Sequence, residues 1–224
     1  MTPAHRMASW MKILSINVGL PRQAVSEGNS VTTGIYKSPI QGRVRVNRLN
    51  IEGDAQGDLS VHGGPNKAVY AYPSEHYAWW QRELPGIEMP WGIFGENLTL
   101  AGLTEGDVHI GDQFRMGTAV LMATQPRLPC YKLGIRFGRR DMPDRFLSSR
   151  RTGFYCAVVE EGDLCEGDPV EHFHRDPNGI SISDLLHLCF DDGNPDGQLV
   201  ERVLKARALP PNWRNRVIKR AQES

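Results

Sequence analysis

Short runs of alternating apolar and polar residues fill the first three quarters of the chain. Residues 12–18 contain an apolar alternation, and residues 44–49 alternate in period two through Val46, as in a β-strand with one buried face. Each run is bounded by Gly, Pro, Asp or Asn, which end strands and begin turns. This spacing predicts a barrel or sandwich rather than repeated strand–helix–strand units. Further runs of this kind cover residues 68–72, 97–100, 108–110, 113–116, 119–123, 155–159 and 170–173.

Helical spacing interrupts this β pattern and then replaces it near the C-terminus. Ser74 is placed to cap a helix that runs to about Leu84, and two shorter helices are expected near residues 129–133 and 144–147. After Gly179, the pair Ser181 and Asp184 resembles a capping box at the start of a further helical pattern. Residues 178–222 therefore predict a module of three short helices. Helices of this length are marginal alone, so we expect them to pack on one another or on the β region.

Composition and charge narrow the class of protein. The chain has 224 residues, of which 40% are hydrophobic, so it can build a core. Its 26 basic and 26 acidic residues give no net charge, which argues against generic nucleic-acid binding. No apolar run approaches the roughly 18 residues that a membrane helix needs. Residues 1–10 lack the apolar core of a signal peptide, so a cytoplasmic protein is expected.

One of the four cysteines has an unusual setting. The four cysteines stand at positions 130, 156, 165 and 189 and form no Cys-x-x-Cys pair. We expect all four to be reduced. Cys130 follows two prolines and stands between Arg127 and Lys132. At a helix N-terminus, these cations would lower the thiol pKa and favour the thiolate. A thiolate there serves either as a nucleophile or as a soft metal ligand.

Two further stretches are candidates for ligand binding. Gly63 and Gly64 stand between His62 and Lys67, where bare backbone N–H groups and a cation could approach an anion; an ordinary hairpin is the alternative. Glu96 and Asn97 follow a glycine and could bind either a polar ligand or local backbone groups. Six Gly-Asp pairs are typical of turns, and only Asp58 is set apart by its neighbours.

Taken in order, three of these stretches resemble the MOSC family, which is related to the C-terminal part of molybdenum-cofactor sulfurases. They are Val-His-Gly-Gly-Pro-x-Lys-Ala-Val at 61–69, Phe-Gly-Glu-Asn-Leu at 94–98 and Gln-Pro-Arg-x-Pro-Cys-Tyr-Lys-Leu at 125–133. The trailing helices resemble a module found in a bacterial subgroup that detoxifies N-hydroxylated base analogues such as hydroxylaminopurine. The resemblance implies a mainly β fold, a distorted β-barrel with short helices, followed by the three-helix module. The expected parts are residues 1–29 (extension and first strand), 30–175 (the MOSC barrel domain) and 178–222 (helices).

The resemblance also implies a cofactor and a set of site residues. The cofactor is the pyranopterin molybdenum cofactor, and Cys130 matches the family cysteine that would bind the metal and take part in catalysis. Arg127 and Lys67 have the charge to hold the cofactor phosphate, and Gly63 and Gly64 could add backbone donors. The remaining candidate contacts are Asp58, His62, Glu96, Asn97, Tyr131 and Lys132.

The implied reaction is the reduction of R–NHOH, with two electrons and two protons, to R–NH₂ and water. His62 suits proton delivery at neutral pH, and is the second expected catalytic residue. The sequence has no cysteine set for an iron–sulfur cluster and no convincing flavin motif, so electrons would come from a separate reductase, such as a flavoprotein. Two alternatives stay open: a non-catalytic carrier of the cofactor or of persulfide sulfur, and a thiol hydrolase that uses Cys130 with His62.

Overall fold

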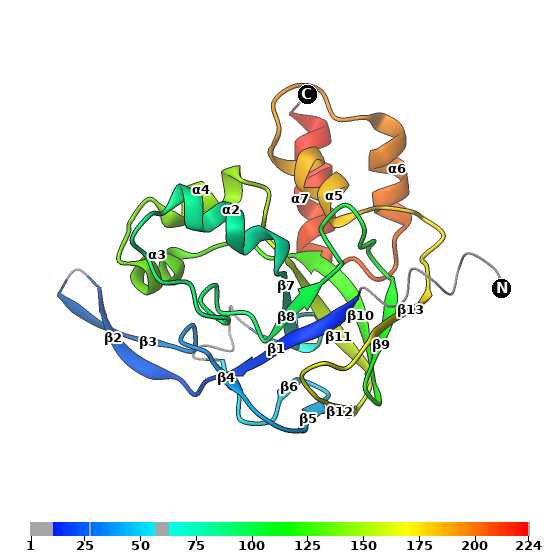
Figure 1. Ribbon diagram of the computed structural model, residues 1–224. Coiled ribbons are helices and arrows are strands. Elements are labelled where there is room, and N and C mark those ends of the chain that lie inside the picture. The colour runs from blue at the N-terminus through cyan, green and yellow to red at the C-terminus, as the bar shows by residue number, and fades with distance from the viewer. Residues whose placement is uncertain (1–10, 27, 57–62, 224) are drawn as a thin grey trace.

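An eight-stranded sheet forms the centre of the computed structural model, which describes residues 11–26, 28–56 and 63–223 (Figure 1). The strand order is β13-β9-β10-β11-β7-β8-β1-β4, and all neighbours are antiparallel except β7 and β8, which are parallel. The strands of this sheet are β1 (Lys12–Val18), β4 (Ser38–Ile40), β7 (Val69–Pro73), β8 (Leu98–Ala101), β9 (Gln113–Met116), β10 (Ala119–Pro126), β11 (Phe154–Glu160) and β13 (Val170–His174).

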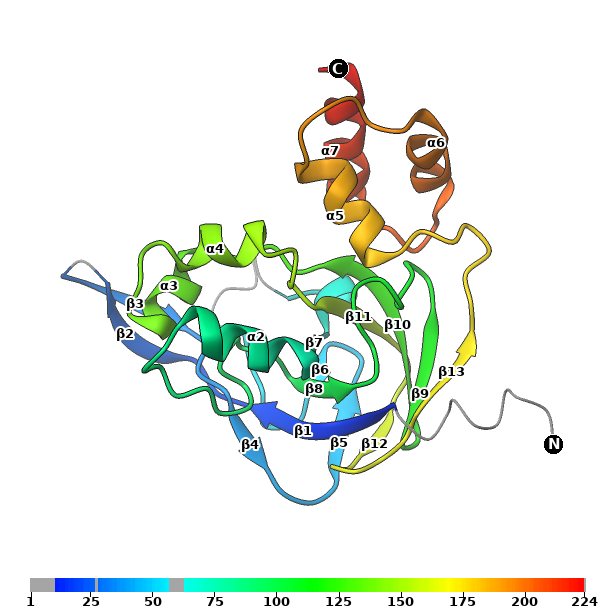
Figure 2. The ribbon, with the colours of Figure 1, turned by 45° about the horizontal axis from the view of Figure 1, so that its top comes forward.

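Two smaller sheets accompany it. Strands β12 (Gly162–Leu164), β5 (Val44–Asn47) and β6 (Asn50–Ile51) form a three-stranded sheet in that order. Strands β2 (Arg22–Ser26) and β3 (Asn29–Thr33) pair only with each other and extend away from the body as a ribbon (Figures 1 and 2). The 22–33 ribbon was not expected, because its side chains are mostly polar and exposed and leave no apolar alternation to detect.

The expected sheet-rich fold with helices is confirmed, but a closed barrel is not. The strand order has two ends, β13 and β4. The sheet nevertheless curls far enough for one isolated bridge to join Lys12 at the start of β1 to Pro169 just before β13. Next to it, the Ile13 N–H donates a hydrogen bond of 3.0 Å to the carbonyl of Asp168. The Gly167 and Val170 N–H groups add bonds of 2.9 Å to the carbonyls of Ile13 and Met11, so the two regions meet over a short stretch without a continuous ladder of paired strands.

Three helices and a 3-10 turn lie beside the sheet, and residues of the three helices belong to an aromatic cluster. They are α2 (Glu75–Glu83), α3 (Tyr131–Phe137), α4 (Met142–Ser148) and the turn η1 (Pro65–Lys67). Helix α2 begins after Ser74 and ends before Leu84, as expected, but the expected cap does not form, because the Ser74 side chain makes no capping hydrogen bond to the backbone. The cluster includes Tyr72, Trp80 and Phe94, and the Trp80 indole donates a hydrogen bond of 2.7 Å to the Tyr72 hydroxyl. This second core holds the loop that carries residues 92–97 against the sheet.

The three expected C-terminal helices form and pack on one another. They are α5 (Ile182–Phe190), α6 (Gly197–Lys205) and α7 (Pro211–Gln222), seen above the sheet in Figure 2. The capping box is confirmed: Asp184 N–H donates to Ser181 Oγ at 2.9 Å, and Ser181 N–H donates to the Asp184 carboxylate at 3.0 Å. Leu185 and Trp213 belong to the same hydrophobic cluster as Leu121 of β10. The helices and the sheet therefore share one core.

One expected strand, residues 108–110, is not part of a sheet. Its backbone pairs with the segment that leads into α5: the Ile110 N–H donates to the Ile180 carbonyl at 2.8 Å, and the Ile182 N–H donates to the Val108 carbonyl at 2.9 Å. The apolar alternation is thus used to dock the C-terminal helices rather than to extend the sheet. Across the described part of the chain, no helix combines the length and apolarity needed to cross a membrane.

Candidate functional site

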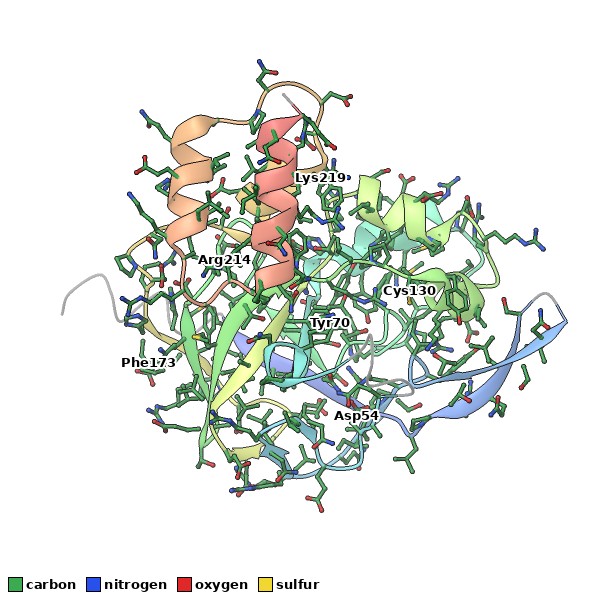
Figure 3. The ribbon with its side chains drawn as sticks, turned by 180° about the vertical axis from the view of Figure 1, so that it is seen from behind. Asp54, Tyr70, Cys130, Phe173, Arg214 and Lys219 are labelled. Atoms are coloured by element: carbon green, nitrogen blue, oxygen red, sulfur yellow. The ribbon has the colours of Figure 1, made fainter. Side chains whose placement is uncertain are left out.

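The three motifs of the sequence meet at one pocket with a cavity volume of about 100 Å³. Lys67 ends η1, Asn97 precedes β8, and Arg127 follows β10. Cys130 stands immediately before α3, and Figure 3 shows it between the interior, where Tyr70 lies, and the β2–β3 ribbon. The expected site residues that line the pocket are Gly63, Lys67, Asn97, Arg127, Cys130 and Lys132.

The pocket is strongly cationic. Lys37, Lys67, Arg127 and Lys132 all line it, and none of the described lining residues is Asp or Glu. Burial lowers the pKa of both Lys37 and Lys67, which reflects how far their amines are withdrawn from water. Cations held in a concave, low-dielectric site favour a bound anion. The arrangement suits a phosphate-bearing ligand.

Arg127 is buried, and no acidic residue forms an ion pair with it within residues 11–26, 28–56 and 63–223. Its side chain lies over the rings of Tyr70 and Phe146, at 5.0 and 5.2 Å, and the residue is 6% exposed. Among the described residues, its Nη1 atom has no hydrogen-bond partner. Burial alone would lower the pKa of Arg127, but the nearby Tyr70, Tyr155 and Cys130 outweigh it and leave the pKa raised. An unpaired buried cation is costly, so a negatively charged ligand is the natural partner for this guanidinium.

Cys130 is placed differently from the two interior cysteines. It is the N-cap residue of α3 with an extended backbone, and its side chain is partly exposed. Cys156 and Cys189 are buried, and burial raises the pKa of their thiols to about 12 and about 11. The expectation of four free thiols holds. Compared with Cys156 and Cys189, only Cys130 is both partly exposed and surrounded by basic side chains.

The buried Lys37–Asp54 ion pair behind the pocket was missed from the sequence. Asp54 is 4% exposed, and its carboxylate pairs with the Lys37 amine and accepts a bond of 2.9 Å from Asn97 Nδ2 and one of 3.0 Å from the Gly19 N–H. The Gly53-Asp54 pair was interpreted as simple turn chemistry, which is wrong for Asp54. Both ends of the Asn97 side-chain amide are hydrogen-bonded within the protein, because its Oδ1 also accepts a bond of 3.0 Å from the Tyr70 N–H.

Glu96 is fully buried and does not line the pocket. Its carboxylate accepts hydrogen bonds from the Gly92 N–H at 2.8 Å, the Phe94 N–H at 3.1 Å and the hydroxyl of Tyr77. Burial raises the pKa of Glu96, although the bonds from Tyr77 and Gly92 oppose the rise. The Glu96 carboxylate therefore fixes the turn that brings Gly95 to the pocket wall.

The remaining expected residues are not in the inner pocket. Tyr131 is 56% exposed and lines a separate groove on the outer side of Cys130. Gly64 precedes η1 with a φ of 85° that favours glycine, and is not among the lining residues. Asp58 and His62 lie outside the described residues. Tyr70 and Tyr155 also line the pocket and were missed from the sequence, because each stands in an apolar strand run where an aromatic side chain indicates only core packing.

The chain is similar to known proteins over nearly its whole length. It is 41% identical over 208 residues to YflK of Bacillus subtilis (strain 168), covering 93% of each chain. The crystal structure of YiiM from Geobacillus stearothermophilus matches with a TM-score of 0.78 and 34% identity, over 94% of this chain and 99% of that one. A protein of Gibberella moniliformis named "Reductase" is 33% identical over 151 residues, which are 66% of this chain and 27% of that protein.

The family assignment rests on the same part of the chain that forms the pocket. The model of the MOSC domain matches residues 58–171, which span η1, the Glu96 turn and the Cys130 loop. The relatives named above cover both this region and, in YflK and YiiM, the C-terminal helices. From the pocket, the fold and these similarities together, the chain belongs to the MOSC domain family.

Proposed function

We propose that this protein is a molybdenum-cofactor-dependent reductase that converts N-hydroxylated compounds, such as hydroxylamino purines and related base analogues, to the corresponding amines. The observation that carries the proposal is the pocket lined by Cys130 and four basic residues, of which Lys37 is paired with Asp54, with no described carboxylate on its wall. MOSC domains are associated with the molybdenum cofactor. A relative that bears the name reductase supports a redox role.

The residues present fit this cofactor. A buried guanidinium nitrogen without a partner among the described residues, together with Lys67 and Lys132, matches a phosphate group. The Cys130 thiol, as thiolate, matches a soft metal ion. When bound, the molybdenum centre would supply the two-electron chemistry of the reaction. Tyr70 and Tyr155 line the same pocket and would shield its apolar side from water.

The protein's own groups would supply positioning and protons. The reaction breaks the N–O bond of R–NHOH, consumes two electrons and two protons, and releases R–NH₂ and water. Lys37 holds a proton on its Nζ atom at the pocket wall, and Asp54 fixes this amine in place. His62, the expected donor, remains part of the proposal. The electrons come from a separate reductase, for which we propose a flavoprotein, and the free thiols fit the reducing cytoplasm.

Elemental analysis of protein purified from molybdate-fed cells tests the proposal. We expect near-stoichiometric molybdenum in the wild type and in Cys165→Ser, which removes another partly exposed thiol, but little in Cys130→Ser. Arg127→Met should lose the metal, while Arg136→Met, which removes a half-buried guanidinium outside the pocket, should keep it. The loaded wild type should reduce 6-N-hydroxylaminopurine when supplied with a chemical reductant.

Two results would contradict the proposal. Equal molybdenum in the wild type and in Cys130→Ser would remove the thiolate from the metal site. No molybdenum or pterin in the wild type, together with a sulfur adduct of about 32 Da on Cys130 and no turnover, would instead support a persulfide carrier.

A further inference from the structure

A second hollow lies on the outer side of Cys130, with a cavity volume of about 810 Å³. It opens between the β2–β3 ribbon, the start of α3 and the start of α4. We call this hollow the outer groove. Among the described residues, Cys130 is the only one that lines both the outer groove and the inner pocket. A molecule seated in the groove would therefore meet the wall of the inner pocket at this cysteine.

The chain around the outer groove is basic. Residues 131–148, which include α3 and α4, contain five basic and two acidic residues, whereas the whole chain has 26 of each. Arg139 and Arg140 line the groove together with a single described carboxylate. The Arg139 guanidinium donates to the Asp141 carboxylate at 3.0 and 2.9 Å, and Arg145 donates to the same carboxylate at 2.6 Å. Two cations therefore share one counter-charge beside the groove.

Two more arginines lie on the elements that flank the groove. Arg22 of β2 and Arg136 of α3 lie over the ring of Tyr36, with their guanidinium carbons 3.5 and 5.0 Å from its centroid. The Arg136 Nε atom has no hydrogen-bond partner among the described residues. In a protein without net charge, this local excess of arginine would attract an acidic partner and orient it as it approaches.

The groove also offers apolar surface between its charges. Tyr131 and Val25 both line it and are 56% and 74% exposed. Tyrosine and arginine are enriched where proteins bind one another, and they often contribute most of the binding energy. The mixture of an exposed tyrosine, an exposed valine and several arginines therefore suits a protein with an acidic surface.

We propose that the outer groove and its arginines are the docking surface of an acidic electron-donor protein, whose electrons enter the inner pocket at Cys130. The inference rests on the proposed function, which requires a separate reductase. A protein cannot enter an inner pocket of about 100 Å³, so it must deliver electrons across the pocket wall. In each turnover, two reduced donors lose one electron each. These two electrons and two protons convert R–NHOH to R–NH₂ and water.

Binding of a defined donor tests the surface directly. The probe is flavodoxin, a small acidic flavoprotein, titrated by calorimetry at low salt into the full-length protein as purified. Arg140→Glu should raise the Kd by about 3- to 30-fold, because an attraction becomes a repulsion. Arg140→Lys keeps the charge and should bind as the wild type does. The matched control is Arg207→Glu, which makes the same change of net charge in the exposed turn between α6 and α7, away from α3 and α4 (Figures 1 and 2).

Turnover of 6-N-hydroxylaminopurine separates docking from chemistry. With reduced flavodoxin, Arg140→Glu should lower kcat/KM for the donor by a similar factor. Added salt should lower the wild-type value as well, because it screens the attraction between exposed charges. With dithionite, a small chemical reductant, Arg140→Glu and the wild type should turn over equally.

Several outcomes would overturn the docking surface. They are no binding of flavodoxin, an equal Kd for the wild type and Arg140→Glu, an equal loss in Arg207→Glu, and an equal loss of turnover with dithionite in Arg140→Glu. The molybdenum content decides the proposed function separately. Flavodoxin binding that depends on Arg140 in a protein without molybdenum would support the surface and reject the molybdenum-dependent reductase.

Discussion

Trp213 of α7 donates a hydrogen bond of 2.7 Å from its indole nitrogen to the side-chain oxygen of Gln125, 88 residues earlier in the chain. Both residues are buried. The other end of the Gln125 amide donates to the backbone carbonyl of Asn66 at 3.1 Å. Since Asn66 lies in η1 next to Lys67, one glutamine connects the C-terminal helices to the turn that carries a pocket cation.

Replacement of Trp213 by Phe should destabilise the protein through this hydrogen bond. The change keeps most of the apolar ring but leaves the Gln125 oxygen buried without its donor, which costs about 1–3 kcal/mol. For a chain of this size we expect the thermal midpoint to fall by several degrees, at roughly 2–4 °C per kcal/mol. Differential scanning calorimetry measures the shift. Trp79→Phe, on the half-buried side of α2, controls for loss of indole volume and should shift the midpoint less.

The Lys37–Asp54 pair predicts strong coupling between two substitutions. Asp54→Asn leaves the Lys37 amine buried without its counter-charge, and loss of one partner of a buried pair costs about 3–5 kcal/mol. In the double variant Lys37→Met/Asp54→Asn neither charge remains, so its loss of unfolding free energy should be smaller than the sum of the two single losses. Urea unfolding of the four proteins measures this. Additive losses would show that the two side chains do not interact.

The cysteines should differ in their reaction with iodoacetamide near pH 8. Burial raises the pKa of Cys156 to about 12 and that of Cys189 to about 11, so only about one thiol in ten thousand and one in a thousand is ionised at that pH. Peptide mapping should find label on Cys130 and none on Cys156 or Cys189 in the folded protein. Denaturation in urea should make all four reactive. Label on Cys156 before Cys130 would contradict the structure.

His172 should make the protein less stable in mild acid. Burial lowers the pKa of His172 below its ordinary value of 6.5; Asp112 opposes the shift and Arg175 adds to it. The unfolded chain therefore takes up the proton first, so stability is lost as the pH falls through 6.5 towards the lower pKa of the folded state. In His172→Gln this loss, measured by urea unfolding between pH 7.5 and 5, should be smaller. His174→Gln, two residues along β13, should retain it.

Local sequence patterns predicted the strands and helices whose conformation is specified by their own residues. Strands at 12–18 and 113–116 follow from alternation bounded by turn residues, and the α5 start follows from Ser181 and Asp184. The pattern at 108–110 was equally apolar, yet its backbone pairs with residues 180–182, a choice made by tertiary contacts. Whether the main sheet closes was likewise undetermined, because alternation fixes a strand's faces and not its neighbours.

The candidate site was predictable to the extent that it lies in contiguous motifs. Lys67, Arg127 and Cys130 were found because charge, glycine or proline surrounds each of them in the sequence, and the structure brings them to one pocket. Lys37 and Asp54 were missed, since a lysine in a short loop and an aspartate after glycine give no sign of burial. Their pairing exists only once the segment before β4 and the loop after β6 are folded together.

The core that α5 and α7 share with β10 makes the C-terminal helices inseparable from the rest of the chain. Leu185, Trp213 and Val217 complete the same cluster as Leu121 and Ala123, so a chain that stopped before residue 180 would expose an apolar sheet face to water. Such a fragment would be prone to aggregation and to proteolysis. The intact protein should then melt in one cooperative transition, and a premature stop codon in this region would remove the whole activity rather than an appendage.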